Sequence, residues 1–317
     1  MRDVFFIVGP TATGKSEIAA DVACELGAEI VSADAFQVYR GLDLLTAKPD
    51  AATLAKVPHH LIGTISILEE MNAEKFRTLA LDAISEIHSG GKLAIVVGGS
   101  GLYIKALTHG LSVATAADPD LRAHLNELSL ADLQKRLRCL DPNTPVDFKN
   151  RRRVVRAIEI CLLSGKPASR QRKEWNEDVV AAAVSGGSLP MRTSAATTQG
   201  VFVFRERHDL YQRINARSEA MFQNGVIEEV RATGAISETA SKMIGLREIH
   251  DLLDGKMSIS QCVAAIQQAT RRYAKRQLTW FRRQTNFLPL NLSMLNHVES
   301  VKWISQKACL AFAQGND

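Results

Sequence analysis

The stretch VFFIVGPTATGKSEIAADVACEL, which runs from Val4 to Leu26, decides the fold. Its first five residues are a short, continuous apolar run, which is typical of a strand buried inside a parallel sheet. The next eight residues, Gly9 to Ser16, fit the pattern G-x-x-x-x-G-K-[ST] in full. Residues 15–26 then carry apolar side chains at helical spacing until Gly27, which stops the helix. This order of strand, glycine-rich loop and helix predicts a phosphate-binding P-loop.

The residue types in this loop suit a di- or triphosphate. Glycine lets the backbone curl so that several N–H groups point inward at phosphate oxygens, and the helix that follows adds its positive N-terminal end. Lys15 adds a point charge, and the Ser16 hydroxyl is a ligand for Mg²⁺, the cofactor that we expect. The motif does not say which phosphate compound binds. We predict that the phosphate is bound by Gly9, Pro10, Thr11, Ala12, Thr13, Gly14, Lys15 and Ser16.

The chain continues as an alternation of strands and helices. Residues 29–33 and 93–97 are apolar runs of strand length, and residues 73–88 place apolar side chains on one helical face. This alternation predicts an α/β core with a parallel sheet, similar to that of P-loop NTPases. Ligands of such sheets bind at the carboxyl ends of the strands, so we expect Asp34 and Gly98–Tyr103 to lie near the P-loop.

The pattern changes after about residue 113. Residues 119–175 are typical of helices with short loops, whereas residues 178–200 are rich in Ala, Gly, Ser and Thr and indicate a loop. Residues 201–204 again indicate a strand, and the pattern from Asp209 to about Phe281 is helical. We therefore predict a P-loop-type catalytic core made of residues 1–112 and 201–317, with a helical C-terminal part. A mainly helical insertion domain occupies residues 113–200.

Composition narrows the class of protein. The 317 residues carry a net charge of +5, with five basic residues among the eight of 149–156 and six among the thirteen of 271–283. Such clusters suit a polyanion such as nucleic acid, although a solvated helix face produces the same pattern. No apolar run approaches the roughly 18 residues that a membrane span needs. Five scattered cysteines without a C-x-x-C pair favour a reducing cytoplasm over a disulfide framework or a zinc module.

An acidic residue is missing where an ordinary P-loop ATPase or kinase has one. Such enzymes hold Mg²⁺ with an acid after a second buried strand. Here the strand at 93–97 is followed by Gly98-Gly99-Ser100-Gly101-Leu102-Tyr103. The first acid at a strand end is Asp34. This difference weakens the interpretation of the chain as a plain ATPase.

Eight stretches in the same order and at similar spacing resemble the bacterial tRNA dimethylallyltransferases, also called tRNA isopentenyltransferases. VGGSGLYIKAL and YAKRQLTWFR are specific to that family rather than to P-loop proteins in general. The stretches are GPTATGKS (9–16), SADAFQVYRGLDLLTAKP (32–49), HHLIG (59–63), VGGSGLYIKAL (97–107), LDPNTPVDFKNRRRVVRAIEICLLSGKPAS (140–169), DLYQRINARSEAM (209–221), MIGLREI (243–249) and TRRYAKRQLTWFR (270–282).

The resemblance implies transfer of a dimethylallyl group from dimethylallyl diphosphate to N6 of adenosine 37 in tRNA, with release of pyrophosphate. Asp34 then corresponds to the base that takes the proton of the amine, although an acid there could instead serve Mg²⁺ or cap a helix. Ser100, at a position that is usually Thr, would hydrogen-bond the diphosphate or the adenosine, or be only a turn residue. Lys15 would stabilise the leaving group during catalysis. Arg217 resembles a residue that reaches the diphosphate, or it forms a surface ion pair.

The resemblance also implies contacts with the anticodon stem-loop. A flipped-out adenosine would be bordered by the residues after the second strand, because the amine is unreachable in a stacked loop. Trp280 and Phe281 are expected in the core rather than under a base, and we expect the enzyme to act as a monomer. The predicted tRNA-binding residues are Asp34, Ala35, Phe36, Gln37, Ser100, Arg122, Lys149, Asn150, Arg151, Arg152 and Arg153.

Three alternatives stay open at this point. A prenyltransferase acting on free adenine nucleotides shares the P-loop and the base, but it needs neither the insertion nor the basic runs. A P-loop kinase of a small metabolite would transfer phosphate from ATP. A non-catalytic RNA-binding P-loop protein would tolerate the loss of Asp34, which is present.

Overall fold

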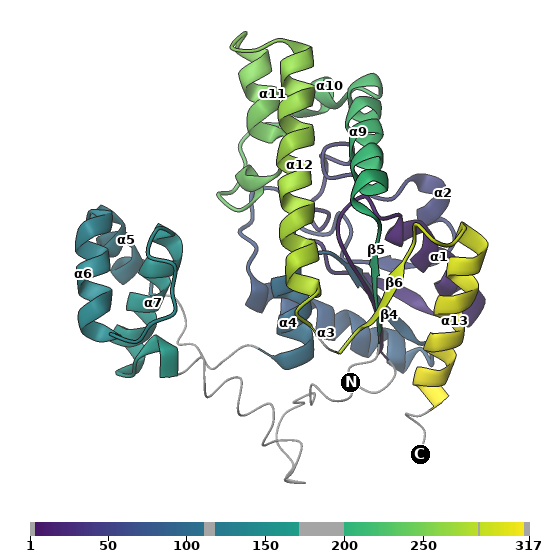
Figure 1. The fold of residues 1–317 in the computed structure, drawn as a ribbon, viewed down its shortest axis with the longest axis horizontal. Coiled ribbons are helices and arrows are strands. Elements are labelled where there is room, and N and C mark those ends of the chain that lie inside the picture. Colours follow the sequence, from purple (N-terminus) through teal and green to yellow (C-terminus); the bar gives the residue numbers. More distant parts are fainter. Residues whose placement is uncertain (1–3, 111–117, 171–199, 285, 314–317) are drawn as a thin grey trace. The chain divides into compact units, whose positions relative to one another are not determined.

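The computed structural model describes residues 4–110, 118–170, 200–284 and 286–313 (Figure 1). The chain divides into two compact units, one of residues 1–108 and 196–317 and the other of residues 109–195. The predicted division, at residues 112/113 and 200/201, lies within a few residues of this one. The loop predicted for residues 178–200 lies, except for Gly200, outside the described residues.

A parallel sheet of six strands forms the centre of the first unit, which confirms the predicted α/β core. The strand order is β3-β2-β4-β1-β5-β6, and each neighbouring pair is parallel. Two edge strands were not predicted: β3, which has two residues, and β6, which lies at the other edge and contains Pro289. The strands are β1 Val4–Val8, β2 Glu29–Ser32, β3 His59–His60, β4 Ala94–Gly98, β5 Gly200–Phe204 and β6 Leu288–Asn291.

Both faces of this sheet are covered, because successive side chains of a strand point to opposite faces. Phe5 and Ile7 of β1 belong to a core that includes side chains of α1 (Lys15–Leu26) and α13 (His297–Ala313). Val4, Phe6 and Val8 belong to the core on the opposite face, which includes side chains of α3 (Ala73–Ser89) and α4 (Gly101–His109). The near-continuous apolar strands follow from burial on both sides.

The helices between β5 and β6 confirm the predicted helical pattern. The longest, α12, begins with a capping box in which Ser258 and Gln261 bond each other's backbone N–H groups. It packs against α9, and Arg271 of α12 donates to Asn215 of α9 at 2.5 Å (Figure 1). The elements are α9 Arg207–Gln223, α10 Val226–Arg231, the 3-10 turn η2 Ala240–Lys242, α11 Leu246–Leu253 and α12 Ile259–Phe281; a further short helix, α2 Ala51–Leu54, follows β2.

The second unit is helical where it is described. Its helices α5 (Pro119–Glu127), α6 (Leu130–Leu140) and α7 (Arg151–Ser164) surround a core of their own that includes Leu125, Leu133, Leu137, Val154 and Ile158. A fully buried acid, Glu159 of α7, accepts hydrogen bonds from Arg122 and Arg156. Buried charges need such partners, because taking an isolated charge out of water is costly.

In the described residues, no helix combines the length and the apolar composition that a membrane crossing requires.

Candidate active site at the P-loop

The P-loop lies between the end of β1 and the start of α1, where the motif places it. Gly14 adopts a left-handed conformation, with φ of 88°, immediately before the helix. Gly9 has no room for a side chain, since a Cβ there would collide with the carbonyl oxygen of Val203 on β5. The buried Thr13 hydroxyl donates to the carbonyl of Pro10 at 3.0 Å. These contacts hold a tight loop at the carboxyl end of the sheet, where parallel sheets bind ligands.

Three arginines of the segment 205–217 donate hydrogen bonds to this loop. Arg205 Nε donates to the Thr13 carbonyl at 2.8 Å and Arg213 Nε to the Ala12 carbonyl at 2.9 Å. Arg217 Nη1 donates to the Thr11 hydroxyl at 3.0 Å. Because the carbonyl oxygens face arginines, the loop can present its N–H groups to a phosphate. Arg205 and Arg213 were not predicted as site residues, although Arg213 precedes Arg217 by four residues and so shares its helix face.

Arg217 has an unused hydrogen-bond donor, which suits its guanidinium group to a bound anion. Its Nε atom is buried and has no hydrogen-bond partner, and it forms no salt bridge with any residue that the structure describes. Burial lowers the pKa of Arg217, with Arg213 acting in the same direction and Asp34 against it. A buried donor without a partner costs free energy, so a bound diphosphate would relieve this cost. This geometry favours the predicted diphosphate contact over the surface ion pair.

Lys15 is a second cation of the site whose charged form is disfavoured by burial. Its Nζ donates to the Pro10 carbonyl at 3.3 Å. Burial lowers the pKa of Lys15 from 10.5 to about 8, the negative charge of Asp34 opposes this shift, and Arg217 adds to it. Desolvation disfavours the charged ammonium, which a bound polyanion would stabilise.

We expect the affinity for a diphosphate, measured with pyrophosphate, to fall as pH rises through about 8, because Lys15 then loses its proton. The unfolded chain keeps that proton up to about 10.5, so the free energy of unfolding rises over the same range. Calorimetric titration at several pH values measures the affinity. The Lys15→Arg variant, which stays charged, is the control. Parallel pH profiles for both proteins would contradict the role of Lys15.

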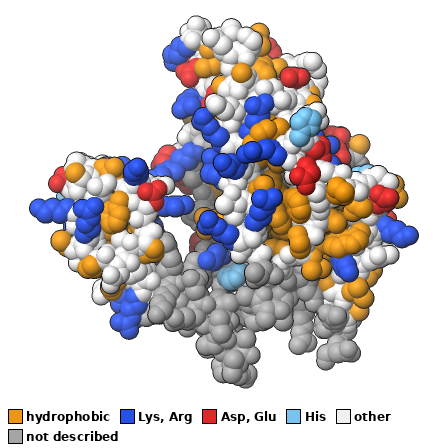
Figure 2. All heavy atoms as spheres, viewed as in Figure 1, with side chains coloured by type: hydrophobic (Ala, Val, Ile, Leu, Met, Phe, Trp, Pro, Cys, Tyr) orange, Lys and Arg blue, Asp and Glu red, His pale blue; other side chains and the backbone are white. Residues whose placement is uncertain are grey.

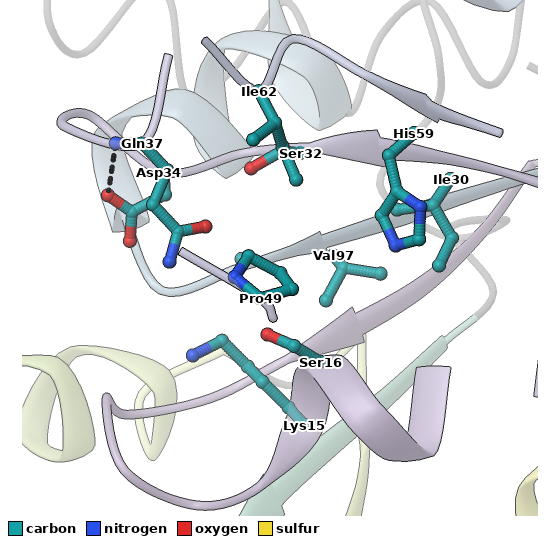
Figure 3. Close-up of a pocket in the computed structure, with 11 residues that line it drawn as sticks. Lys15, Ser16, Ile30, Ser32, Asp34, Gln37, Pro49, His59, Ile62 and Val97 are labelled. Carbon is teal, nitrogen blue, oxygen red and sulfur yellow. Dashed lines mark hydrogen bonds between the residues drawn. The ribbon is translucent and has the colours of Figure 1, made fainter. Parts of the chain in front are cut away.

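Asp34 stands at the end of β2, in the same pocket as Lys15 and Ser16 (Figure 3). Its Oδ1 accepts the backbone N–H groups of Phe36 at 3.0 Å and Gln37 at 3.3 Å, which fixes the side chain in a local turn. No residue that the structure describes donates a hydrogen bond to Oδ2. One carboxylate oxygen therefore holds the turn, and the other is available to a substrate.

Ser100 lies beside Asp34, although the two are far apart in the chain. The backbone N–H of Ala35 donates to Ser100 Oγ at 3.0 Å, which leaves the hydroxyl hydrogen of Ser100 to donate elsewhere. Tyr273 of α12 is a further neighbour, which the sequence analysis did not predict. Burial raises the pKa of Tyr273, Asp34 adds to the rise, and hydrogen bonding with Ser100 and Gln277 opposes it. The phenol therefore stays protonated at neutral pH.

The pocket also contains residues that were not predicted as site residues. His59 of β3 lies in it, with Nδ1 at 2.8 Å from the Val57 carbonyl, and burial lowers the pKa of His59. Its imidazole is therefore neutral at pH 7. Figure 3 shows polar and apolar side chains facing one another across the pocket; the apolar ones are Ile30, Pro49, Ile62 and Val97. An apolar group attached to a phosphate would meet both kinds of surface.

Comparisons with known proteins match this architecture. The model of the family described as "IPP transferase" matches residues 37–284. The chain belongs to this family.

Curated relatives and solved structures agree with that assignment. The chain is 42% identical over 289 residues to tRNA dimethylallyltransferase 1 of Citrifermentans bemidjiense, covering 89% of this chain and 90% of the relative. It is 41% identical to the tRNA dimethylallyltransferase of Akkermansia muciniphila, covering 88% and 90%. The crystal structure of the tRNA isopentenylpyrophosphate transferase of Bacillus halodurans has a TM-score of 0.70 at 31% identity, covering 100% of this chain and 98% of that one.

The residues predicted to bind tRNA divide between the two units. Ala35, Phe36 and Gln37 follow Asp34 in the first unit, and the Gln37 amide donates to the Ala47 carbonyl at 2.8 Å. Ser100 also lies in the first unit. The others lie in the second unit, where Asn150 caps α7 and Lys149 and Arg153 are exposed. Contacts of all these residues with tRNA stay predictions.

Two arginines of the second unit have structural partners that the sequence could not reveal. Arg151 donates to the carbonyls of Asn126 and Leu128 at the end of α5, and Arg122 forms a two-pronged pair with Glu159. These hydrogen bonds to partners in the same unit hold the Arg151 and Arg122 side chains in place. They favour a structural role for Arg122, in addition to any contact with tRNA.

The Arg122→Ala variant is expected to lower the free energy of unfolding by about 2 kcal/mol, because the buried Glu159 keeps only Arg156 as a charged partner. Thermal and urea unfolding measure the loss. Lys135→Ala, at an exposed position of α6, is the control and should change stability by less than about 0.5 kcal/mol. Equal stability of the two variants would show that the pair with Arg122 contributes nothing.

Proposed function

We propose that the chain transfers a dimethylallyl group from dimethylallyl diphosphate to N6 of adenosine 37 in tRNA, giving N6-dimethylallyladenosine and pyrophosphate. By family it is a transferase, a tRNA dimethylallyltransferase. The observation that carries the proposal is the placement of Asp34 and Ser100 beside a P-loop whose cations, Lys15 and Arg217, are poorly compensated. The reaction needs the base beside the attacking amine and the cations beside the leaving diphosphate to lie close together.

The carboxylate of Asp34 acts on the nucleophile. The exocyclic amine of adenine is weak, because its lone pair is delocalised into the ring. As the bond from N6 to the first carbon of the dimethylallyl group forms, the bond from that carbon to the diphosphate oxygen breaks. Asp34 Oδ2 takes the proton of the amine, which removes the positive charge that would otherwise build on nitrogen. Ser100, whose hydroxyl oxygen accepts the backbone N–H of Ala35, and Tyr273, which hydrogen-bonds with Ser100, lie beside Asp34.

The P-loop acts on the leaving group. Its N–H groups, the N-terminus of α1, Lys15 and Arg217 stabilise the negative charge that develops on the diphosphate. The described residues contain no group of three or more His, Cys, Asp or Glu side chains that could hold a metal by themselves. The Ser16 hydroxyl lines the pocket and is a hard oxygen donor that fits Mg²⁺, with substrate oxygens and water completing its shell. When bound, Mg²⁺ would neutralise diphosphate charge.

A basic face supports tRNA as the acceptor. The outer side of α12 and the turn after it carry five exposed cations, and Figure 2 shows Lys and Arg side chains gathered where α12 lies. These cations suit the phosphates of an anticodon stem-loop. Phe281 is buried and Trp280 packs against the core, as predicted, so neither is presented for base stacking. The basic side chains are Arg272, Lys275, Arg276, Arg282 and Arg283.

The Lys275→Ala and Arg276→Ala substitutions together are expected to reduce the salt dependence of tRNA binding by about two units of slope, because each phosphate contact contributes about one. Filter binding across a series of salt concentrations measures the slope. Lys307→Ala on α13, where Lys307 lies over Trp303, is the control. A slope unchanged from the parent protein would show that this face of α12 does not contact the phosphate backbone.

The decisive experiment is mass analysis of nucleosides from tRNA incubated with the protein, Mg²⁺ and dimethylallyl diphosphate. We expect N6-dimethylallyladenosine with a natural tRNA and none with the same tRNA carrying guanosine at position 37. Modification of free AMP but not tRNA would support the adenine-nucleotide alternative. Phosphate transfer from ATP to a small acceptor would support a kinase.

We further propose that the enzyme acts as a monomer in the cytoplasm. All five cysteines are free thiols, which suits a reducing compartment. Light scattering at micromolar concentration tests the monomer, and a mass twice that of the chain would contradict it.

A further inference from the structure

One side chain of α12 connects the two loops that make up the active site. The carboxamide of Gln277 accepts the backbone N–H of Thr11 at 2.9 Å and donates to the carbonyl of Gly99 at 2.8 Å. Thr11 belongs to the P-loop, and Gly99 directly precedes Ser100. Gln277 is 6% exposed, so its side chain is largely shielded from solvent.

The loop at residues 98–101 is built around this contact. A Cβ at Gly99 would collide with Gln277 Nε2 and approach the Gly9 carbonyl to 2.9 Å. A Cβ at Gly101 would lie 2.6 Å from the ring of Trp280, one turn further along α12. The glycines therefore let α12 approach the loop closely, and the close approach places the Gln277 amide between both loops.

We propose that Gln277 is a positioning residue that sets the separation between the diphosphate and the nucleophile. The inference rests on the proposed function, in which the P-loop holds the leaving diphosphate and the Ser100 loop borders the adenosine. Misplacement of reacting groups by about 1 Å costs up to about 100-fold in rate. A tether that spans both loops controls that distance without touching either substrate.

Only a glutamine-like side chain fits this role. The tether needs one acceptor for Thr11 N–H and one donor for the Gly99 carbonyl on the same planar group. Glutamate keeps the acceptor but places a carboxylate against the Gly99 oxygen. Methionine keeps the length and volume but makes neither hydrogen bond. Gln277→Glu therefore removes only the bond to Gly99, whereas Gln277→Met removes the bonds to both Thr11 and Gly99.

The test measures two quantities: the affinity for pyrophosphate with Mg²⁺ and the turnover of tRNA. For Gln277→Met we expect kcat/KM for dimethylallyl diphosphate to fall about 10-fold, equivalent to about 1.4 kcal/mol, and pyrophosphate binding to weaken. For Gln277→Glu we expect pyrophosphate affinity within about 2-fold of the parent but kcat lowered about 10-fold, because the acceptor for Thr11 remains. Both variants should bind tRNA with unchanged affinity.

The matched control is Gln267→Met on the same helix. Gln267 donates to Glu219 of α9 at 3.3 Å and lies away from the P-loop, so its loss should leave kcat and pyrophosphate affinity unaltered. If the Gln277 variants behave like this control, or lose only thermal stability, Gln277 is a structural residue and the inference is wrong. If Gln277→Met does not fold, the split between affinity and kcat in Gln277→Glu decides.

A third variant separates failure of this inference from failure of the proposed function. Lys15→Met removes the P-loop charge. If it still binds pyrophosphate like the parent protein, the P-loop is not the diphosphate site and the proposed function fails with it. If Lys15→Met loses pyrophosphate while both Gln277 variants bind and turn over normally, only the positioning role is overturned.

Discussion

Replacing Asp34 with Asn is expected to lower kcat about 100- to 10,000-fold, while the affinity for tRNA should change little. The magnitude is that of a general base, since the amide cannot take the proton of the adenine amine. Asn is chosen because its side-chain oxygen can still accept the N–H groups of Phe36 and Gln37, which Asp34 Oδ1 accepts in the parent protein. Single-turnover kinetics with saturating dimethylallyl diphosphate and a filter-binding assay for tRNA measure the two quantities.

The control for this result is Asp34→Ala, which also removes the turn contacts. If Asp34 were only a turn or capping residue, Asn would retain activity and Ala alone would lose it. If the loss in tRNA affinity equalled the loss in turnover, Asp34 would hold the adenosine rather than act as its base. A large loss of kcat in both variants, with affinity kept, identifies the base.

Replacing Lys15 with Met is expected to lower kcat/KM for dimethylallyl diphosphate about 100-fold, as removal of one strong donor at a developing charge does elsewhere. Folding should not suffer. Because burial lowers the pKa of Lys15 to about 8, the charged ammonium destabilises the folded protein at pH 7, and Met removes that cost. We therefore expect a Tm equal to or above that of the parent protein.

Steady-state kinetics and thermal unfolding together test this second result. Lys75→Met is the control, because Lys75 lies on α3 in an exposed pair with Glu69. It should leave kinetics unchanged. A lower Tm with normal kinetics for Lys15→Met would reverse the interpretation, since Lys15 would then stabilise the loop and take no part in the reaction.

The local sequence was enough to find the parts of the site that are contiguous in the chain. The P-loop is recognisable because a buried strand, two glycines, a lysine and a helix must follow in that order to wrap a phosphate. Asp34 was recognisable because it follows a buried strand, and the carboxyl ends of parallel strands meet at one edge. Edge strand β3 was missed, since two residues produce no periodic pattern.

Side-chain partners across the fold could not be read in the same way. Arg205 and Arg213 look like any arginines near a helix start, and only the packing of α9 shows that they hold the carbonyls of Thr13 and Ala12. Arg122 was predicted to bind tRNA, and only the folding of α5 onto α7 brings it to Glu159. Hydrogen bonds of this kind depend on distances of about 3 Å, which sequence spacing does not set between separate elements.

The sequence by itself determined the parallel sheet, the P-loop and the strand-end positions of Asp34 and Ser100, because hydrophobic period and glycine placement are local properties of the chain. The tertiary structure decided that Gln277, which is 266 residues from Thr11, lies between the two loops. It also decided that Lys15 and Arg217 are partly buried and close enough to Asp34 for their charges to interact. Burial and the approach of residues distant in the chain produce the pKa shifts of Lys15 and Arg217, and both arise only when the helices pack on the sheet.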